Sequence, residues 1–198
     1  MLVIFRTDSS SQIGLGHVMR CLTLAETLRN RGDEVIFICR EHENNYCELV
    51  ESQGFKIERL PHIPLDEIDI TDDYTSTYAS WLGATWQKDA EQTIKFIKVL
   101  EKKPDWIVVD HYALDYRWEG ALRDMSKKIM VIDDIADRNH DCDLLLDQNL
   151  INNMHTRYND ILSIDCIRLL GPDYAIMQSD YAKFHNRIPL RSGPIKRL

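Results

Sequence analysis

Short, almost entirely apolar runs alternate along this chain with longer segments of helical period. The clearest run, Trp106–Asp110, is followed by a helical segment at Tyr116–Met125 and by a second apolar run at Lys128–Ile132. A strand that is apolar at consecutive positions is covered on both faces, which is typical of a parallel sheet. The repeated strand–helix–strand units therefore predict a doubly wound α/β domain with a mainly parallel sheet.

The other expected elements follow the same alternation. Apolar residues recur at helical spacing in the segments expected to be helices, and glycine or proline follows several of them, as is common just past a helix end. We expect strands at Leu2–Arg6, Glu34–Cys39, Phe55–Leu60, Asp143–Leu146 and Cys166–Leu170, helices at His17–Asn30, Asn45–Gln53 and Asp89–Lys102, and a long loop at 61–78.

The charge of the chain argues against broad nucleic-acid binding. Its 24 Lys and Arg against 32 Asp and Glu give a formal net charge of −8, whereas nucleic-acid binding needs a basic face. A small anionic ligand is compatible with this balance, because a few backbone N–H groups and one or two arginines suffice for a diphosphate.

No apolar stretch approaches the roughly 18 residues of a membrane span, and the first residues lack signal-peptide features. We therefore expect a cytoplasmic protein that binds neither nucleic acid nor membrane.

The cysteines indicate a reduced protein. There are five of them, with no C-x-x-C pair, and Cys21, Cys39 and Cys166 fall in apolar helix or strand patterns. They are better interpreted as reduced core residues than as disulfides or metal ligands. No set of histidines and cysteines has zinc spacing, and we expect no cofactor.

The loop after the first expected strand is the strongest candidate site. It runs from Arg6-Thr7-Asp8 to Gly14-Leu15-Gly16-His17, at the edge where open parallel sheets bind ligands. Gly14 and Gly16 permit close backbone approach to a ligand, and the helix N-terminus offers free N–H donors. The positive end of a helix disfavours imidazolium, so His17 can be a neutral base that accepts a proton. The alternative is that His17 caps the helix or binds a phosphate.

Two further strand ends carry reactive side chains. Asp110-His111-Tyr112 brings together a carboxylate, an imidazole and a phenol; the trio favours substrate binding or proton transfer, although Asp110 alone is more simply a turn cap. Asp133-Asp134 could bind Mg²⁺ together with substrate phosphates. Aspartate also caps turns readily, and we favour that interpretation for this pair.

Several motifs, in order, resemble a known family. The pattern is similar to that of the UDP-2,4-diacetamido-2,4,6-trideoxy-β-L-altropyranose hydrolases of pseudaminic acid biosynthesis and of related spore-coat polysaccharide proteins. It covers nearly all of residues 1–185. The motifs are Arg6-Thr7-Asp8, Gly16-His17-Val18-Met19-Arg20-Cys21-Leu22, Trp81-Leu82-Gly83, Asp89-Ala90-Glu91-Gln92-Thr93, Val109-Asp110-His111-Tyr112, Ile132-Asp133-Asp134, Asp147-Gln148-Asn149, Tyr158 and Gly171-Pro172-Asp173-Tyr174-Ala175.

The resemblance implies a chemistry for this loop. In such a hydrolase, His17 is the general base for a water that attacks the anomeric carbon, UDP leaves, the configuration inverts and no metal takes part. The fold implied is a two-domain one like that of the GT-B glycosyltransferases, with the active site between the domains, and Tyr112 lies near the sugar. With the residues singled out above, the expected substrate-binding set is Arg6, Asp8, Gly14, Gly16, Asp110, His111 and Tyr112.

Two departures from the family pattern bear on domain organisation and function. Gln178 stands where family members generally carry arginine, and the glycine-rich second domain that grips UDP has no counterpart before Leu198. We expect residues 1–180 to form the N-terminal Rossmann-like domain that carries the base, and residues 181–198 to be a linker toward a C-terminal UDP-binding domain missing from this chain, which alone would be inactive or weak. The alternatives are half of a GT-B-like glycosyltransferase and a non-catalytic sugar- or partner-binding module.

Overall fold

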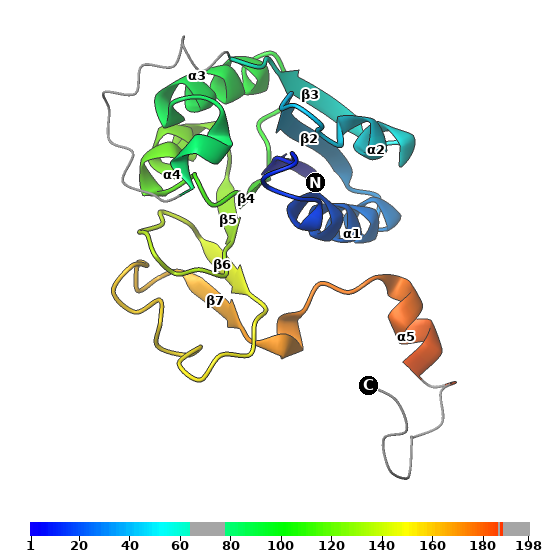
Figure 1. The fold of residues 1–198 in the computed structure, drawn as a ribbon, viewed down its shortest axis with the longest axis vertical. Helices are drawn as coiled ribbons and strands as arrows, with labels where there is room; N and C mark the ends of the chain where they lie inside the picture. The colour runs from blue at the N-terminus through cyan, green and yellow to red at the C-terminus, as the bar shows by residue number, and fades with distance from the viewer. Residues whose placement is uncertain (64–77, 186, 188–198) are drawn as a thin grey trace.

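Seven parallel strands form one sheet (Figure 1). In this computed structural model, which describes residues 1–63, 78–185 and 187, the strand order is β3-β2-β1-β4-β5-β6-β7. The strands are β1 (Leu2–Thr7), β2 (Glu34–Arg40), β3 (Lys56–Leu60), β4 (Trp106–Asp110), β5 (Lys128–Ile132), β6 (Leu144–Asp147) and β7 (Ile167–Leu170). The order reverses between β1 and β4, and this switch point is where doubly wound sheets bind their ligands. The predicted fold class is confirmed.

Two pairs of helices cover the two faces of the sheet. Figure 1 shows α1 (Gly16–Asn30) and α2 (Cys47–Ser52) on one face and α3 (Trp86–Ile97) and α4 (Tyr116–Leu122) on the other. A last helix, α5 (Ser179–His185), follows a segment that leaves the sheet after β7. Short 3-10 turns complete the described chain: η2 (Ala79–Leu82), η3 (Arg123–Met125) and η4 (Pro172–Tyr174).

Helix ends differ from the sequence expectations by a few residues. Helix α3 begins at Trp86 rather than Asp89, because the side chain of Thr85 accepts the backbone N–H of Lys88 and caps the helix there. It ends at Ile97 rather than Lys102. The loop expected at 61–78 lies mostly outside the described residues, and so does most of the expected linker, although α5 spans its predicted start at residue 181.

Alternate side chains of the strands enter two apolar layers. On the α3–α4 side, Ile4 packs in a cluster with Trp118, and on the α1–α2 side Phe5 packs with Phe37, whose ring centroid lies 5.1 Å away. All five cysteines are buried and free, which confirms Cys21, Cys39 and Cys166 as reduced core residues. None of the described helices is both long and apolar enough to cross a membrane.

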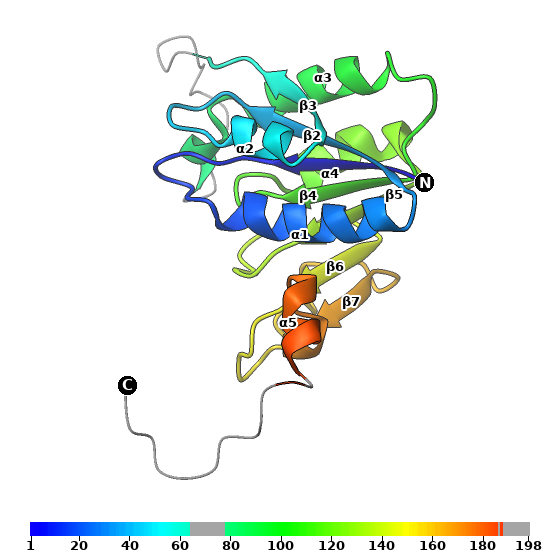
Figure 2. The same cartoon turned by 90° about the vertical axis from the view of Figure 1, so that its right-hand side faces the viewer.

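Figure 2 shows the central strands from the side, with the N-terminus at one end and the loop that leaves β1 at the other. The carboxyl ends of β1, β4 and β5 therefore lie along one edge, which is the edge that faces the viewer in Figure 1. The parallel register pairs Thr7 with Asp110 at this edge. Residues that follow these strand ends are consequently close in space.

Candidate active site

A histidine and an aspartate meet at the switch point between β1 and β4. The Nδ1 atom of His17, in the first turn of α1, lies 2.5 Å from Oδ1 of Asp110, the last residue of β4. Asp110 is fully buried and His17 is 7% exposed. The His17 side chain is therefore hydrogen-bonded to Asp110. A carboxylate acceptor at Nδ1 places the proton on that nitrogen and leaves the lone pair on Nε2, which is the arrangement of a general base with its orienting group.

Arg20, one turn further along α1, fixes the carboxylate from the other side. Its Nε and Nη2 atoms each lie 2.6 Å from an oxygen of Asp110, and its Nη1 lies 3.1 Å from Oδ2 of Asp134. Burial by itself would raise the pKa of Asp110, but hydrogen bonds from Arg20 and His17 outweigh it and lower that pKa to about 2. Asp110 is therefore a permanent anion at physiological pH.

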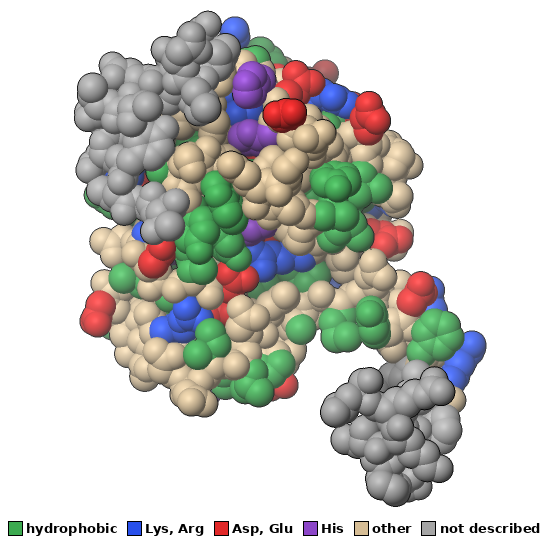
Figure 3. Space-filling model, viewed as in Figure 1, with side chains coloured by type: hydrophobic (Ala, Val, Ile, Leu, Met, Phe, Trp, Pro, Cys, Tyr) green, Lys and Arg blue, Asp and Glu red, His purple; other side chains and the backbone are tan. Residues whose placement is uncertain are grey.

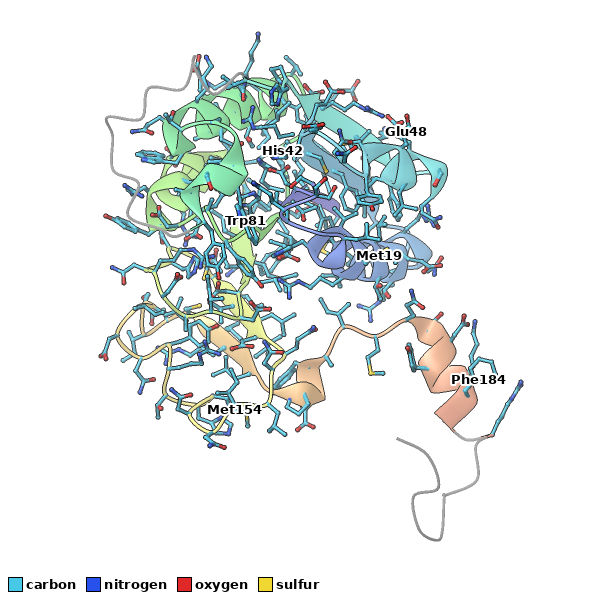
Figure 4. All side chains as sticks on the ribbon, in the orientation of Figure 1. Met19, His42, Glu48, Trp81, Met154 and Phe184 are labelled. Carbon is cyan, nitrogen blue, oxygen red and sulfur yellow. The ribbon has the colours of Figure 1, made fainter. Side chains whose placement is uncertain are left out.

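Tyr112 closes the site on the side of β5. Its hydroxyl donates a 2.5 Å hydrogen bond to Oδ1 of Asp134, and its ring meets the His17 imidazole edge-on with centroids 4.6 Å apart. Burial and the Asp134 carboxylate raise the pKa of Tyr112 well above its ordinary value, so the phenol stays protonated. The rings of Trp81 and Tyr78 lie next to Tyr112, with centroids at 5.9 and 5.1 Å. In Figure 4, Trp81 and Met19 of α1 lie near the centre of the view, whereas Met154 and Phe184 lie toward its periphery.

The glycines of the first loop leave room beside this cluster. Gly14 has a φ of +76°, a conformation that favours glycine, and a Cβ added at Gly14 or at Gly16 would meet no atom within 4 Å. The loop is held from behind, because the hydroxyl of Ser10 accepts the N–H groups of Gln12 and Ile13. Open space in front of two glycines is compatible with a ligand that approaches the backbone closely.

Arg6, Asp8 and His111 lie behind the site. Arg6 and Asp8 are fully buried, and the Arg6 guanidinium pairs with Asp8 and with Asp89 of α3. Arg40, at the end of β2, adds a second guanidinium 2.7 Å from Asp89. His111 is 3% exposed and its Nε2 lies 3.2 Å from Asp8, and burial lowers the pKa of His111, which favours the neutral ring. These three predicted substrate-binding residues belong to a buried ion cluster.

Asp133 and Asp134, the two aspartates that follow β5, make different contacts. Asp133 accepts the backbone N–H of Ala136, which confirms the turn cap, and it also accepts the hydroxyl of Tyr158. Asp134 instead receives Arg20 and Tyr112 at the site. Within the described part of the chain, no group of three or more His, Cys, Asp or Glu side chains is placed to hold a metal ion.

Arg20 was not predicted as a site residue, and Asp134 was predicted only as a turn cap, with Mg²⁺ binding as the alternative. For Arg20 a signal was present, because residues three apart share one face of a helix, and Arg20 follows His17 at that spacing. On the face drawn in Figure 3, histidine, basic and acidic side chains come together beside a hydrophobic patch.

Another depression lies at the opposite edge of the sheet. It is lined by the amino ends of the strands and the end of α3, including Leu2, Phe55 and Phe96. Both of its lysines are paired with one of its glutamates, since Lys56 and Lys102 each lie 3.2 Å from Glu34. It holds no histidine or cysteine among its lining residues, so the carboxyl edge is the better candidate for chemistry.

No model of a known protein family matches the chain. The chain is 28% identical over 182 residues to the UDP-2,4-diacetamido-2,4,6-trideoxy-beta-L-altropyranose hydrolase of Campylobacter jejuni, covering 91% of this chain and 53% of that protein. The expected resemblance to this hydrolase is confirmed. The chain spans about half the length of this relative.

Two archaeal proteins are also similar. An uncharacterized protein of Methanocaldococcus jannaschii is 23% identical over 194 residues, which are 97% of this chain and 34% of that protein. An uncharacterized glycosyltransferase of Methanosarcina acetivorans is 31% identical over 123 residues, which are 60% of this chain and 29% of that protein. Among solved structures, LpCGTa and TcCGT1, each in complex with UDP, match with a TM-score of 0.46 at 17% and 15% identity, covering 68% and 66% of this chain and 32% and 28% of theirs.

Proposed function

We propose that this chain supplies the general base of a hydrolase that releases UDP from a UDP-2,4-diacetamido-2,4,6-trideoxy hexose, the reaction expected in pseudaminic acid biosynthesis. The observation that carries the proposal is the His17–Asp110 pair, 2.5 Å apart at the switch point of the sheet. Similarity to the Campylobacter hydrolase supplies the substrate class. The open space at Gly14 and Gly16 supplies room for a ligand beside the base.

The reaction follows from the chemistry of this pair. Nε2 of His17 takes a proton from water while the water oxygen forms a bond to the anomeric carbon. The bond between that carbon and the diphosphate oxygen breaks, and UDP leaves with the bonding electrons. Attack on the side opposite to UDP inverts the configuration. The Asp110 carboxylate stabilises the imidazolium that forms, in the way an aspartate orients and stabilises histidine in hydrolytic triads.

The remaining predicted site residues take different parts in this proposal. Gly14, Gly16 and Tyr112 lie where they can touch the sugar, because they border the base. Arg6, Asp8 and His111 act from behind, holding the ends of β1, β2 and β4 in place. In this proposal these three residues support the site and do not contact the substrate directly, because they are buried in the described structure.

UDP release from UDP-2,4-diacetamido-2,4,6-trideoxy-β-L-altropyranose tests the proposal. Because the chain spans about half of its hydrolase relative, we expect slow turnover, and the assay is run with protein in excess over substrate. UDP should accumulate with the wild type and with the exposed control His155→Ala, and fall about 10²–10⁴-fold in His17→Ala, the usual range for losing a general base. Equal release by His17→Ala and by a wild type that releases UDP above a protein-free blank would contradict the proposal.

A glycosyltransferase is the second candidate, and the similarity to the Methanosarcina glycosyltransferase is the observation that favours it. In that case His17 would take the proton of an acceptor hydroxyl instead of water, and the geometry of the base would be the same. Product analysis separates the two. Free sugar supports hydrolysis, whereas sugar linked to an added acceptor alcohol supports transfer.

A further inference from the structure

One arginine joins the two strand ends of the site. All three donor nitrogens of Arg20 are engaged, two with Asp110 at the end of β4 and one with Asp134 after β5. Asp110 in turn holds His17, and Asp134 holds Tyr112, whose ring lies against His17. The five side chains therefore form a closed ring of contacts in which the base and the phenol are neighbours.

We propose that Arg20 and Asp134 are positioning residues for the base: Arg20 aims the Asp110 carboxylate at Nδ1 of His17, and Asp134 sets the Tyr112 ring against the imidazole. This inference rests on the proposed role of His17 as general base. Neither residue touches the reacting atoms in this account, and both act through a neighbour.

The fork of Arg20 explains why the carboxylate has one orientation. A bidentate guanidinium–carboxylate pair fixes the plane of both groups. With Nε on Oδ2 and Nη2 on Oδ1 of Asp110, the second lone pair of Oδ1 remains for Nδ1 of His17 at 2.5 Å. A lysine, as a point charge, would neutralise Asp110 without fixing this plane.

Arg20 also balances the charge behind the base. An unpaired aspartate beside a histidine favours imidazolium, which cannot accept a proton. Arg20 shares the charge of Asp110, and its Nη2 lies 3.4 Å from Nδ1 of His17, where a positive ring would be repelled. Among the described residues, the charged or titratable groups near His17 include Arg20 from its own helix, Asp110 at the end of β4, and Tyr112 with its partner Asp134. His111, next to Asp110, interacts electrostatically with His17, and the Sγ atom of Cys21 lies 3.4 Å from Asp110. A variant without Arg20 therefore has Asp110 next to the His17 ring with no arginine paired to it.

NMR of the imidazole tests the inference on the whole 198-residue chain without relying on turnover. In Arg20→Met, the Nδ1–H resonance of His17 should broaden, because the Asp110 carboxylate that accepts this hydrogen is no longer held in one orientation. Arg20→Lys should leave the resonance broadened as well, since a lysine restores the charge without the fork. Arg31→Met, an exposed arginine just past the end of the same helix, should leave this resonance unchanged.

Asp134→Asn provides a second test that keeps Asp110 and Arg20 in place. It removes the charge that receives Tyr112, and the nuclear Overhauser contact between the Tyr112 ring and the His17 imidazole should weaken at least twofold. The Asp134 side chain is 19% exposed, so this variant is expected to fold even if Arg20→Met does not. An unchanged Nδ1–H resonance of His17 in folded Arg20→Met, or an unchanged ring contact in Asp134→Asn, would overturn the inference. Neither result depends on UDP release, so a failure here differs from a failure of the proposed function.

Discussion

Nδ1 of His17 and Oδ1 of Asp110 are 2.5 Å apart although 93 residues separate them in the chain. Parallel pairing of β1 with β4 produces this contact, because the residues after both strands emerge at the same edge of the sheet. The contact gives His17 a defined tautomer. It also makes the negative charge of Asp110 the feature of the site to test.

Asp110→Asn removes that charge and retains the volume. The amide can donate to Nδ1 and so favour the wrong tautomer of His17, and we expect UDP release to fall about 10²–10⁴-fold. The measurement is single-turnover UDP release, with Asp124→Asn, an exposed position, as the matched control. A loss of less than threefold in a folded Asp110→Asn would show that the carboxylate is not needed.

Acid stability reports the same ion pairs independently of activity. The pKa of Asp110 is lowered from 3.8 to about 2 in the folded protein, so the ionised carboxylate favours the folded state. This contribution is fully present above pH 4 and is lost as the pH falls toward 2. Between pH 5 and pH 2.5 the unfolding free energy of the wild type should fall by roughly 1–2 kcal/mol more than that of Asp110→Asn, measured by urea denaturation. Parallel pH profiles for the two proteins would contradict the pairing.

The buried ion cluster makes Asp89 a stability residue. Its carboxylate receives Arg6, Arg40 and the indole N–H of Trp118, all inside the protein. In Asp89→Asn the buried guanidinium groups of Arg6 and Arg40 lose a negatively charged partner. We expect a loss of about 3–5 kcal/mol in unfolding free energy. Glu91→Gln on the same helix breaks only an exposed pair with Lys88 and should cost less than about 1 kcal/mol. Similar urea midpoints for the two variants would refute the role given to the cluster.

The two loop glycines should respond differently to alanine. Gly14 needs its positive φ, so Gly14→Ala should cost about 1 kcal/mol of stability. Gly16 has no such requirement, and its Cβ would enter open space, so Gly16→Ala should fold as stably as the wild type. If ligand occupies that space, Gly16→Ala should raise KM for UDP release while its melting temperature stays within 2 °C of wild type, roughly the scatter of a neutral substitution. An unchanged KM would place the ligand elsewhere.

Much of the fold was predictable because apolar runs and helical spacing are local signals. The run at Trp106–Asp110 and the spacing in Asp89–Ile97 both correspond to elements of the structure. Helix ends were less predictable, since the start of α3 depends on the hydroxyl of Thr85, a single capping contact.

The site was predictable in part. The residues after β1 and β4 follow from the rule that ligands bind at the carboxyl edge, and His17 with Tyr112 lies there. The burial of Arg6 and Asp8 was not predictable, because it depends on Asp89, which is 83 residues from Arg6 in the chain. The part taken by Arg20 likewise depends on two aspartates that only the folded sheet brings to it.

The most direct measurement is UDP release from UDP-2,4-diacetamido-2,4,6-trideoxy-β-L-altropyranose in ¹⁸O-enriched water, for wild type and His17→Ala side by side. The account predicts that the wild type releases UDP whose phosphates carry no ¹⁸O, because water bonds to the anomeric carbon, and that His17→Ala releases about 10²–10⁴-fold less. Incorporation of ¹⁸O into UDP, or equal release by the two proteins, would contradict it.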